Sequence, residues 1–226
     1  MINVLIVHFN TPELTRACVL SVLKHTPNCN ITVFDNSTTK PFKPMNGVRV
    51  IDNTKGQEID FNKLINIFQN RRESDNGYGS AKHCYSVNYC FKYFNDGFIL
   101  LDSDVLVKRD LSELWNSKII WSGQPHISRK HPVNIERLYP FCCYINIALC
   151  RKLGIRYFDK NHMWQLSEGR GSWYDTGAWF LEATKGIPSR TIKIKDYIIH
   201  YGGGSFRKDK SETPEKWLSN NTKYYQ

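Results

Sequence analysis

Short apolar runs that alternate with helical segments constrain the fold of this chain more than any other feature of its sequence. Residues Ile2–Phe9, INVLIVHF, form a nearly continuous apolar run, as expected of a strand buried on both faces. The sequence NTPE follows, in which Thr11 suits an N-cap and Pro12 suits the first helical position. We therefore predict a helix from Pro12 onward and a second strand at Asn30–Ser37.

The same alternation continues through the first half of the chain. The predicted elements are a strand at Val48–Asp52, a helix at Asp60–Asn70, a helix over Ser80–Phe94 with Ser80 as its cap, a strand at Phe98–Asp102 and a helix capped by Asp110 with Leu111, Leu114 and Trp115 inward. Strands that alternate with helices form a doubly wound, mostly parallel sheet flanked by helices. The predicted fold class is therefore α/β.

The net charge bears on which partners the protein binds, and the number and spacing of its cysteines bear on whether it contains disulfides or a zinc site. The net charge of +10 favours anionic partners, but the basic residues are scattered and no RNA-recognition signature or basic recognition helix is present. We therefore expect no nucleic-acid partner. The seven cysteines are odd in number and include no CxxC pair, which favours buried reduced thiols over disulfides or zinc.

The start of the chain resembles a strand and shows no signal-type segment. No apolar run reaches membrane-spanning length, so we expect a cytoplasmic protein without a membrane span, and peripheral association with a membrane stays open. The oligomeric state does not follow from the sequence.

Polar residues follow three of the predicted strands. Asn10 and Thr11 follow the first strand, Asp35 and Asn36 lie near the end of the second, and Asp102 and Asp104 lie at and just beyond the end of the strand at 98–102. Each residue alone is more often an ordinary strand-end or cap residue. In a doubly wound sheet, however, ligands bind beyond the carboxyl ends of the strands, and three such positions at one edge favour a ligand site.

The Asp-x-Asp pair suggests a divalent metal. Asp102 and Asp104 offer carboxylate oxygens, which Mg²⁺ and Mn²⁺ prefer as ligands beside substrate phosphates. A later apolar run ends in His200, whose imidazole could complete a mixed oxygen and nitrogen shell, and the alternative is a histidine bonded to backbone. Three glycines follow at 202–204, and Arg207 beyond them could neutralise the charge of a diphosphate.

From Ile2 to about Phe206 the sequence resembles nucleotide-sugar-dependent glycosyltransferases of the GT-A fold, most closely the inverting family 2 type. The matching stretches are VLIVHFNTPELTRACVLSVLKHT, VFDNSTT, NGYGSAKHCYSVNYCF, ILLDSDVLV, WYDTGAWF and IIHYGGGS. The resemblance implies an enzyme that transfers a sugar from a UDP- or GDP-sugar donor to a hydroxyl acceptor in polysaccharide or glycan synthesis. It also implies a Mn²⁺ or Mg²⁺ cofactor.

The resemblance implies roles for individual residues and for parts of the chain. The donor-binding residues that it implies are Asn10, Thr11, Asp35, Lys82, Asp102, Ser103 and Arg207, and the metal ligands are Asp102, Asp104 and His200. Asn10 and Asp35 would contact the nucleoside. Within a single domain at 1–226, residues from 1 to about 105 would bind the nucleotide sugar and residues from about 106 to 206 the acceptor, and we expect 207–226 to be a flexible C-terminal tail.

Two points of the mechanism stay open at this stage. An inverting reaction needs a base for the acceptor hydroxyl, and Asp175 is our candidate, with helix capping as the alternative role. The aromatic residues Trp164, Trp173 and Tyr174 near it could stack on sugars or belong to the core. The stretch DSDVLVKRDLSELW also resembles the retaining family 8 enzymes, and a non-catalytic nucleotide-binding module is a further alternative.

Overall fold

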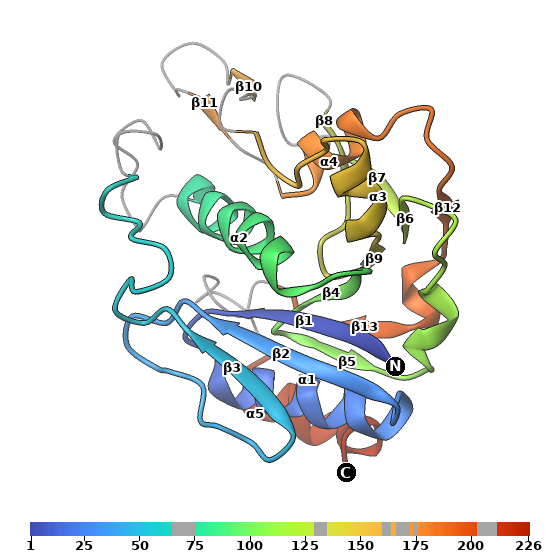
Figure 1. Ribbon diagram of the computed structural model, residues 1–226. Helices are drawn as coiled ribbons and strands as arrows, with labels where there is room; N and C mark the ends of the chain where they lie inside the picture. Colours follow the sequence, from blue (N-terminus) through green and yellow to red (C-terminus); the bar gives the residue numbers. More distant parts are fainter. Residues whose placement is uncertain (65–75, 129–134, 160–163, 166–171, 174–175, 203–211) are drawn as a thin grey trace.

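The computed structural model describes residues 1–64, 76–128, 135–159, 164–165, 172–173, 176–202 and 212–226. Within these residues a seven-stranded sheet forms the centre of the molecule (Figure 1). Its strands, in spatial order, are β12 (Arg190–Thr191), β6 (Trp121–Gly123), β9 (Cys142–Ile145), β4 (Phe98–Asp102), β1 (Ile2–His8), β2 (Cys29–Asp35) and β3 (Val48–Asp52). Neighbouring strands pair in parallel except where β9 lies antiparallel between β4 and β6. The predicted mostly parallel α/β sheet is confirmed.

Helices cover both faces of this sheet (Figure 1). Helix α1 (Pro12–His25) covers one face with α5 (Pro214–Asn220) packed against it, and α2 (Asn76–Cys90), α3 (Ile147–Lys152) and α4 (Ala178–Ala183) cover the other. Within the part of the chain that the structure describes, no helix has both the length and the apolar composition to cross a membrane.

The central strand β1 shows how the sequence builds this core. Val4 and Ile6 point into the cluster beneath α1, whereas Leu5 and Val7 point into the cluster beneath α2. Successive side chains of a strand point to opposite faces, so a strand covered on both faces needs an unbroken apolar run. The run INVLIVH meets this requirement, and the predicted buried strand is confirmed.

Shorter elements surround the sheet. Two-stranded pairs are formed by β5 (Val105–Val107) with β13 (Ile198–His200), β7 (Pro125–Ser128) with β8 (Ile135–Leu138), and β10 (Trp164–Gln165) with β11 (Ser172–Trp173). The 3₁₀ helices are η2 (Phe91–Tyr93), η3 (Leu111–Leu114), η4 (Ile194–Asp196) and η5 (Thr222–Tyr224).

The predicted helices differ from the observed ones at their ends. Helix α2 begins at Asn76, so Ser80 lies inside the helix instead of capping it, because packing against the sheet outweighs the low helix propensity of the glycines at 77 and 79. Asp110 caps an element as predicted, accepting a hydrogen bond from Ser112 N, but that element is the 3₁₀ helix η3. The helix predicted at Asp60–Asn70 lies mostly outside the described residues.

The C-terminal segment differs from the flexible tail that the sequence predicts. Residues 212–226 contain α5, which Thr213 caps by accepting a hydrogen bond from Lys216 N. The indole of Trp217 is buried against Leu14 and Ala17 of α1. A buried tryptophan removes enough apolar surface from water to hold a short helix in place, which explains the difference. Residues 207–211 lie outside the described part.

Candidate functional site

The carboxyl ends of four strands meet at one edge of the sheet, as the sequence predicts. The register pairs His8 at the end of β1 with Asp35 at the end of β2, and Asp35 with Asp52 at the end of β3. On the other side of β1, Val7 pairs with Asp102, the last residue of β4. Ligands bind at this edge in open α/β sheets.

Asp102, Asp104 and His200 converge just beyond this edge. The chain leaves β4 at Asp102, turns, and continues as β5, which pairs antiparallel with β13 so that His200 lies opposite Val105. Tyr201 N donates a hydrogen bond of 2.9 Å to the carbonyl of Asp104 and holds the two segments together. His200 Nε2 then lies 3.1 Å from Asp104 Oδ1. The prediction that these three residues lie together agrees with this arrangement.

The donor set fits a hard divalent cation. One ligand atom from each of Asp102, Asp104 and His200 lies within 4.8 Å of the other two. Ligands bound 2.0–2.6 Å from one cation lie at most about 4–5 Å apart, so small side-chain adjustments suffice to surround an ion. Two carboxylates and one imidazole form a mixed oxygen and nitrogen donor set that can hold a divalent cation.

The three residues of this cluster differ in their exposure to solvent. Asp104 is buried, Asp102 is partly buried and His200 is exposed to solvent, so a ligand can reach the imidazole side. Phe141 stacks on the His200 ring with centroids 4.3 Å apart, which restricts the ring's rotation. Burial raises the pKa of the nearby Cys18 thiol well above its ordinary value, and the negative charges of Asp104 and Asp102 raise it further.

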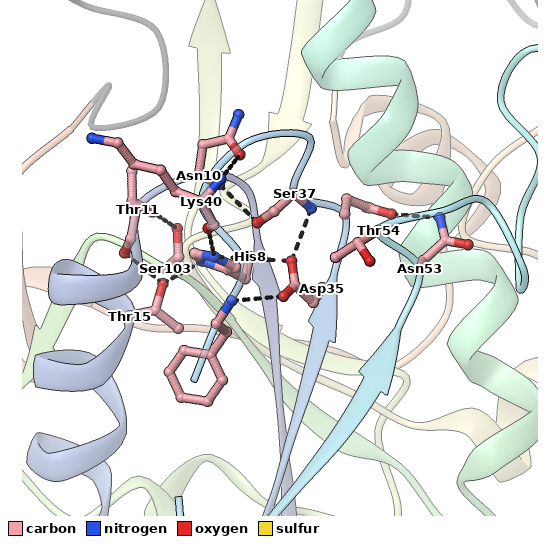
Figure 2. Close-up of polar contacts among 12 residues, drawn as sticks. His8, Asn10, Thr11, Thr15, Asp35, Ser37, Lys40, Asn53, Thr54 and Ser103 are labelled. Atoms are coloured by element: carbon pink, nitrogen blue, oxygen red, sulfur yellow. Dashed lines mark hydrogen bonds and ion pairs between the residues drawn. The ribbon is translucent and has the colours of Figure 1, made fainter. Parts of the chain in front are cut away.

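Two hydroxyls connect the first helix to this turn. Thr11 Oγ1 lies 3.1 Å from Ser103 Oγ, and both residues are buried (Figure 2). Thr11 occupies the N-cap position of α1 but makes no side-chain cap bond. The predicted capping role is therefore wrong for its hydroxyl, which instead links the start of α1 to the Asp-Ser-Asp turn.

Asn10 organises the loop that follows β2. Its backbone lies in the left-handed region with φ of 54°, which is uncommon outside glycine and which asparagine tolerates best. Its Oδ1 accepts hydrogen bonds of 3.0 Å from the backbone N–H groups of Thr38, Thr39 and Lys40. Asn10 therefore presents this loop at the sheet edge (Figure 2).

Asp35 has backbone partners for both carboxylate oxygens. Oδ1 accepts a hydrogen bond from Ser37 N at 2.8 Å and Oδ2 accepts one from Phe42 N at 2.7 Å, while His8 Nε2 lies 3.9 Å away (Figure 2). Only 2% of Asp35 is exposed. In the structure this carboxylate fixes the loop after β2, and a contact with the nucleoside stays a prediction.

Helix α2 directs two consecutive side chains toward the same region. Lys82 is buried, with Nζ 5.3 Å from the ring centroid of Phe9 and 5.2 Å from that of Phe61. The ring of His83 faces Asp102, with 3.3 Å between Nε2 and Oδ1. The sequence gives no signal that singles out His83, because only the position of α2 beside β4 reveals its partner.

Three predicted features fall wholly or partly outside the described residues. Asp175 and Arg207 belong to segments that are not described, and the side chains of Trp164 and Trp173 are not described either. Helix α4 has Gly177 as its N-cap, with φ of 81°, and a Cβ atom at this position would clash with the carbonyl oxygen of Leu138. The cap position that we considered for Asp175 therefore belongs to a glycine.

Comparisons with known proteins show a distant structural similarity to a solved structure. No family model matches this chain, and no curated protein matches it. Among solved structures, the chain is similar to the galactosyltransferase LgtC, crystallised with donor and acceptor sugar analogues, with a TM-score of 0.46 and 13% identity. The match covers 71% of this chain and 61% of LgtC, less than two thirds of that protein. A similarity of this size does not by itself establish a shared function.

Proposed function

We propose that this protein is a metal-dependent glycosyltransferase that moves a sugar from a UDP- or GDP-sugar to a hydroxyl acceptor. The observation that supports the proposal is the convergence of Asp102, Asp104 and His200 beyond the carboxyl edge of a mostly parallel sheet. The motifs that resemble GT-A glycosyltransferases in sequence supply two of these residues from ILLDSDVLV and the third from IIHYGGGS.

Each part of the site has a task in this reaction. Asp102, Asp104 and His200 would hold Mn²⁺ or Mg²⁺, which supplies Lewis-acid stabilisation for the leaving nucleoside diphosphate. The loop that Asn10 and Asp35 hold in place would border the nucleoside. The buried side of the cluster around Asp104 limits the access of water, which strengthens electrostatic interactions there.

The stereochemical course is the finer part of this proposal. We propose inversion with Asp175 as the base that deprotonates the acceptor hydroxyl, and retention of the family 8 kind is the competing course. Asp175→Asn keeps the size of the side chain and cannot accept the proton, so transfer should slow by about 10²–10⁴. Product NMR that shows retained anomeric configuration would remove the need for this base.

Thermal melting with nucleotides tests the proposed function. UDP or GDP together with Mn²⁺ should raise the melting temperature, whereas a single-stranded oligonucleotide should not, because only a ligand that binds the folded state stabilises it. Asp104→Asn should lose the shift. A panel of nucleotide sugars, screened for slow hydrolysis, then identifies the donor.

Each outcome of that experiment has a defined meaning. A shift with the oligonucleotide and none with the nucleotides would contradict the proposal. A shift with nucleotide and Mn²⁺ but no hydrolysis or transfer of any sugar in the panel would instead indicate a non-catalytic nucleotide-binding module.

A further inference from the structure

His83 is a largely buried imidazole beside the candidate metal centre. Its Nε2 lies 3.3 Å from Asp102 Oδ1, and only 15% of its side chain is exposed. Both ring nitrogens are shielded from solvent, and neither has a hydrogen-bond partner among the residues that the structure describes. Buried polar groups are normally satisfied, so an imidazole in this position needs an explanation such as a functional role or a missing ion or water.

The backbone that carries His83 is held firmly at the sheet edge. Ser86 Oγ, one turn further along α2, donates to the carbonyl of Lys82 at 2.7 Å and accepts a hydrogen bond of 2.6 Å from Asn36 Nδ2. Asn36 in turn accepts a 2.9 Å hydrogen bond from Asn53 Nδ2. This chain of buried contacts ties α2 to the ends of β2 and β3, so His83 approaches Asp102 from a fixed helix.

The chemistry of the pair defines what the imidazole can do. A carboxylate only accepts hydrogen bonds, so the contact is attractive when Nε2 carries a hydrogen. In the structure the pair is a 3.3 Å contact without a hydrogen bond, and a rotation of either side chain would be needed to form one. A carboxylate held through Oδ1 by His83 keeps its other oxygen for a cation.

We propose that His83 is a positioning residue that orients Asp102 for metal and donor binding. This inference rests on the proposed function, because it assigns Asp102 to the metal centre. Groups that hydrogen-bond to a metal ligand set the ligand's orientation, and their loss typically weakens metal binding or activity about 10- to 100-fold. His83 contacts Asp102 and not the cation, so its effect passes through that carboxylate.

Mn²⁺ binding to three variants of the full chain tests this role. Mn²⁺ alone serves as the probe, followed by calorimetry or by electron paramagnetic resonance of the free ion. His83→Leu fills the space without a donor and should weaken Mn²⁺ binding about 10- to 100-fold. His83→Gln places an N–H donor near the position of Nε2 and should restore most of the affinity. His25→Leu is the matched control, because His25 Nε2 is also buried without a hydrogen-bond partner among the described residues, at the end of α1 away from the site.

A role in packing alone predicts the opposite order. In that case the apolar leucine should preserve stability and Mn²⁺ binding, and the polar glutamine should reduce both. Melting curves of each variant show which of them fold. A double-mutant cycle with Asp102→Asn adds a second criterion, because loss of His83 should cost little once its partner carboxylate is gone.

The outcomes separate this inference from the proposed function. Wild-type protein that binds Mn²⁺, with His83→Leu binding equally well, would overturn the role of His83 and leave the metal centre intact. Equal losses in the leucine and glutamine variants would also overturn it. Absence of Mn²⁺ binding in the wild type, both alone and with UDP or GDP, would contradict the metal centre itself.

Discussion

His200 Nε2 lies 3.1 Å from Asp104 Oδ1, although the two residues are 96 positions apart in the chain. The antiparallel pairing of β13 with β5 brings them together, because it places His200 opposite Val105, the neighbour of Asp104. The candidate metal centre therefore depends on a short strand pair outside the main sheet. Substitutions that disturb either strand should affect both ligands.

The metal ligands give the first prediction. Asp104→Asn and His200→Ala should each weaken Mn²⁺ binding at least about 10-fold and remove most metal-dependent turnover of the donor, because each removes one ligand atom from a set of three. Mn²⁺ titrations and donor hydrolysis measure the two effects, and circular dichroism reports folding. Unchanged metal dependence in either folded variant would show that the substituted residue is not a ligand.

Asp35 gives the second prediction, which concerns stability. Asp35→Ala should lower the free energy of unfolding by about 2–4 kcal/mol, because two buried backbone N–H groups lose a charged acceptor. Urea denaturation measures the loss, and nucleotide binding is measured on the same variant. Asp52→Ala is the matched control, since Asp52 ends the neighbouring strand but is exposed, and it should change stability by about 1 kcal/mol or less. If Asp35→Ala loses nucleotide affinity while its stability is unchanged, the result would contradict the loop-fixing role and support the nucleoside contact that the sequence resemblance implies.

His8 gives the third prediction, which concerns pH. Burial lowers the pKa of His8 below its ordinary value of 6.5, although the charges of Asp35 and Glu13 and the carbonyl of Lys40 act in the opposite direction. Below about pH 6.5, His8 is therefore protonated in the unfolded chain but still neutral in the folded chain. The free energy of unfolding falls as the pH is lowered toward the pKa of His8 in the folded chain. Above pH 6.5 the residue is neutral in both states and contributes no slope.

The contribution of His8 is measurable by difference. Urea denaturation between about pH 5 and pH 7.5 should show a shallower loss of stability in His8→Gln than in the wild type, and the two slopes should differ by at most about 1.4 kcal/mol per pH unit. Thr15→Val is a useful companion, because it removes the 2.6 Å contact of Thr15 Oγ1 with His8 Nδ1 and leaves the imidazole in place. Identical slopes in His8→Gln and the wild type would exclude His8 as their source.

The C-terminal helix gives the fourth prediction. Trp217→Ala should destabilise the protein by about 3 kcal/mol, because the indole is buried against α1 and against Tyr201, whose ring centroid lies 5.3 Å away. Tyr201 directly follows His200, so the variant should also weaken Mn²⁺ binding. Trp115→Ala is a control, because the partly buried indole of Trp115, just after η3, packs against a different core cluster. If the Trp217→Ala protein is destabilised but binds Mn²⁺ as tightly as the wild type, α5 does not support the metal centre.

Much of the architecture follows from the sequence, because it depends on residues close together in the chain. The unbroken apolar run of β1 requires cover on both faces, and Pro12 starts α1 where the sequence predicts. The register of a parallel sheet then places the residues after each strand at one edge, so the positions of Asp35 and Asp102 follow from local pattern alone.

The partners of these side chains do not follow from the sequence. Local pattern places a carboxylate at Asp35 but does not show that two backbone N–H groups of the next loop occupy it. It likewise places Thr11 at a helix start but not its hydroxyl beside Ser103. A polar residue at a strand end can bind a ligand or support a loop, and only the neighbouring segments decide between these roles.

The sequence by itself determined the early strands and the first helix, β1, α1, β2, β3 and β4, and the edge at which the polar residues gather, because hydrophobic period and capping act over a few residues. Tertiary structure alone decided that His83 faces Asp102 and that Trp217 packs against Tyr201, and the pairing of β13 with β5 sets the geometry in which the predicted partners His200 and Asp104 meet. Those contacts arise from strand pairing and helix packing between distant segments, and burial of the shared core sets their geometry.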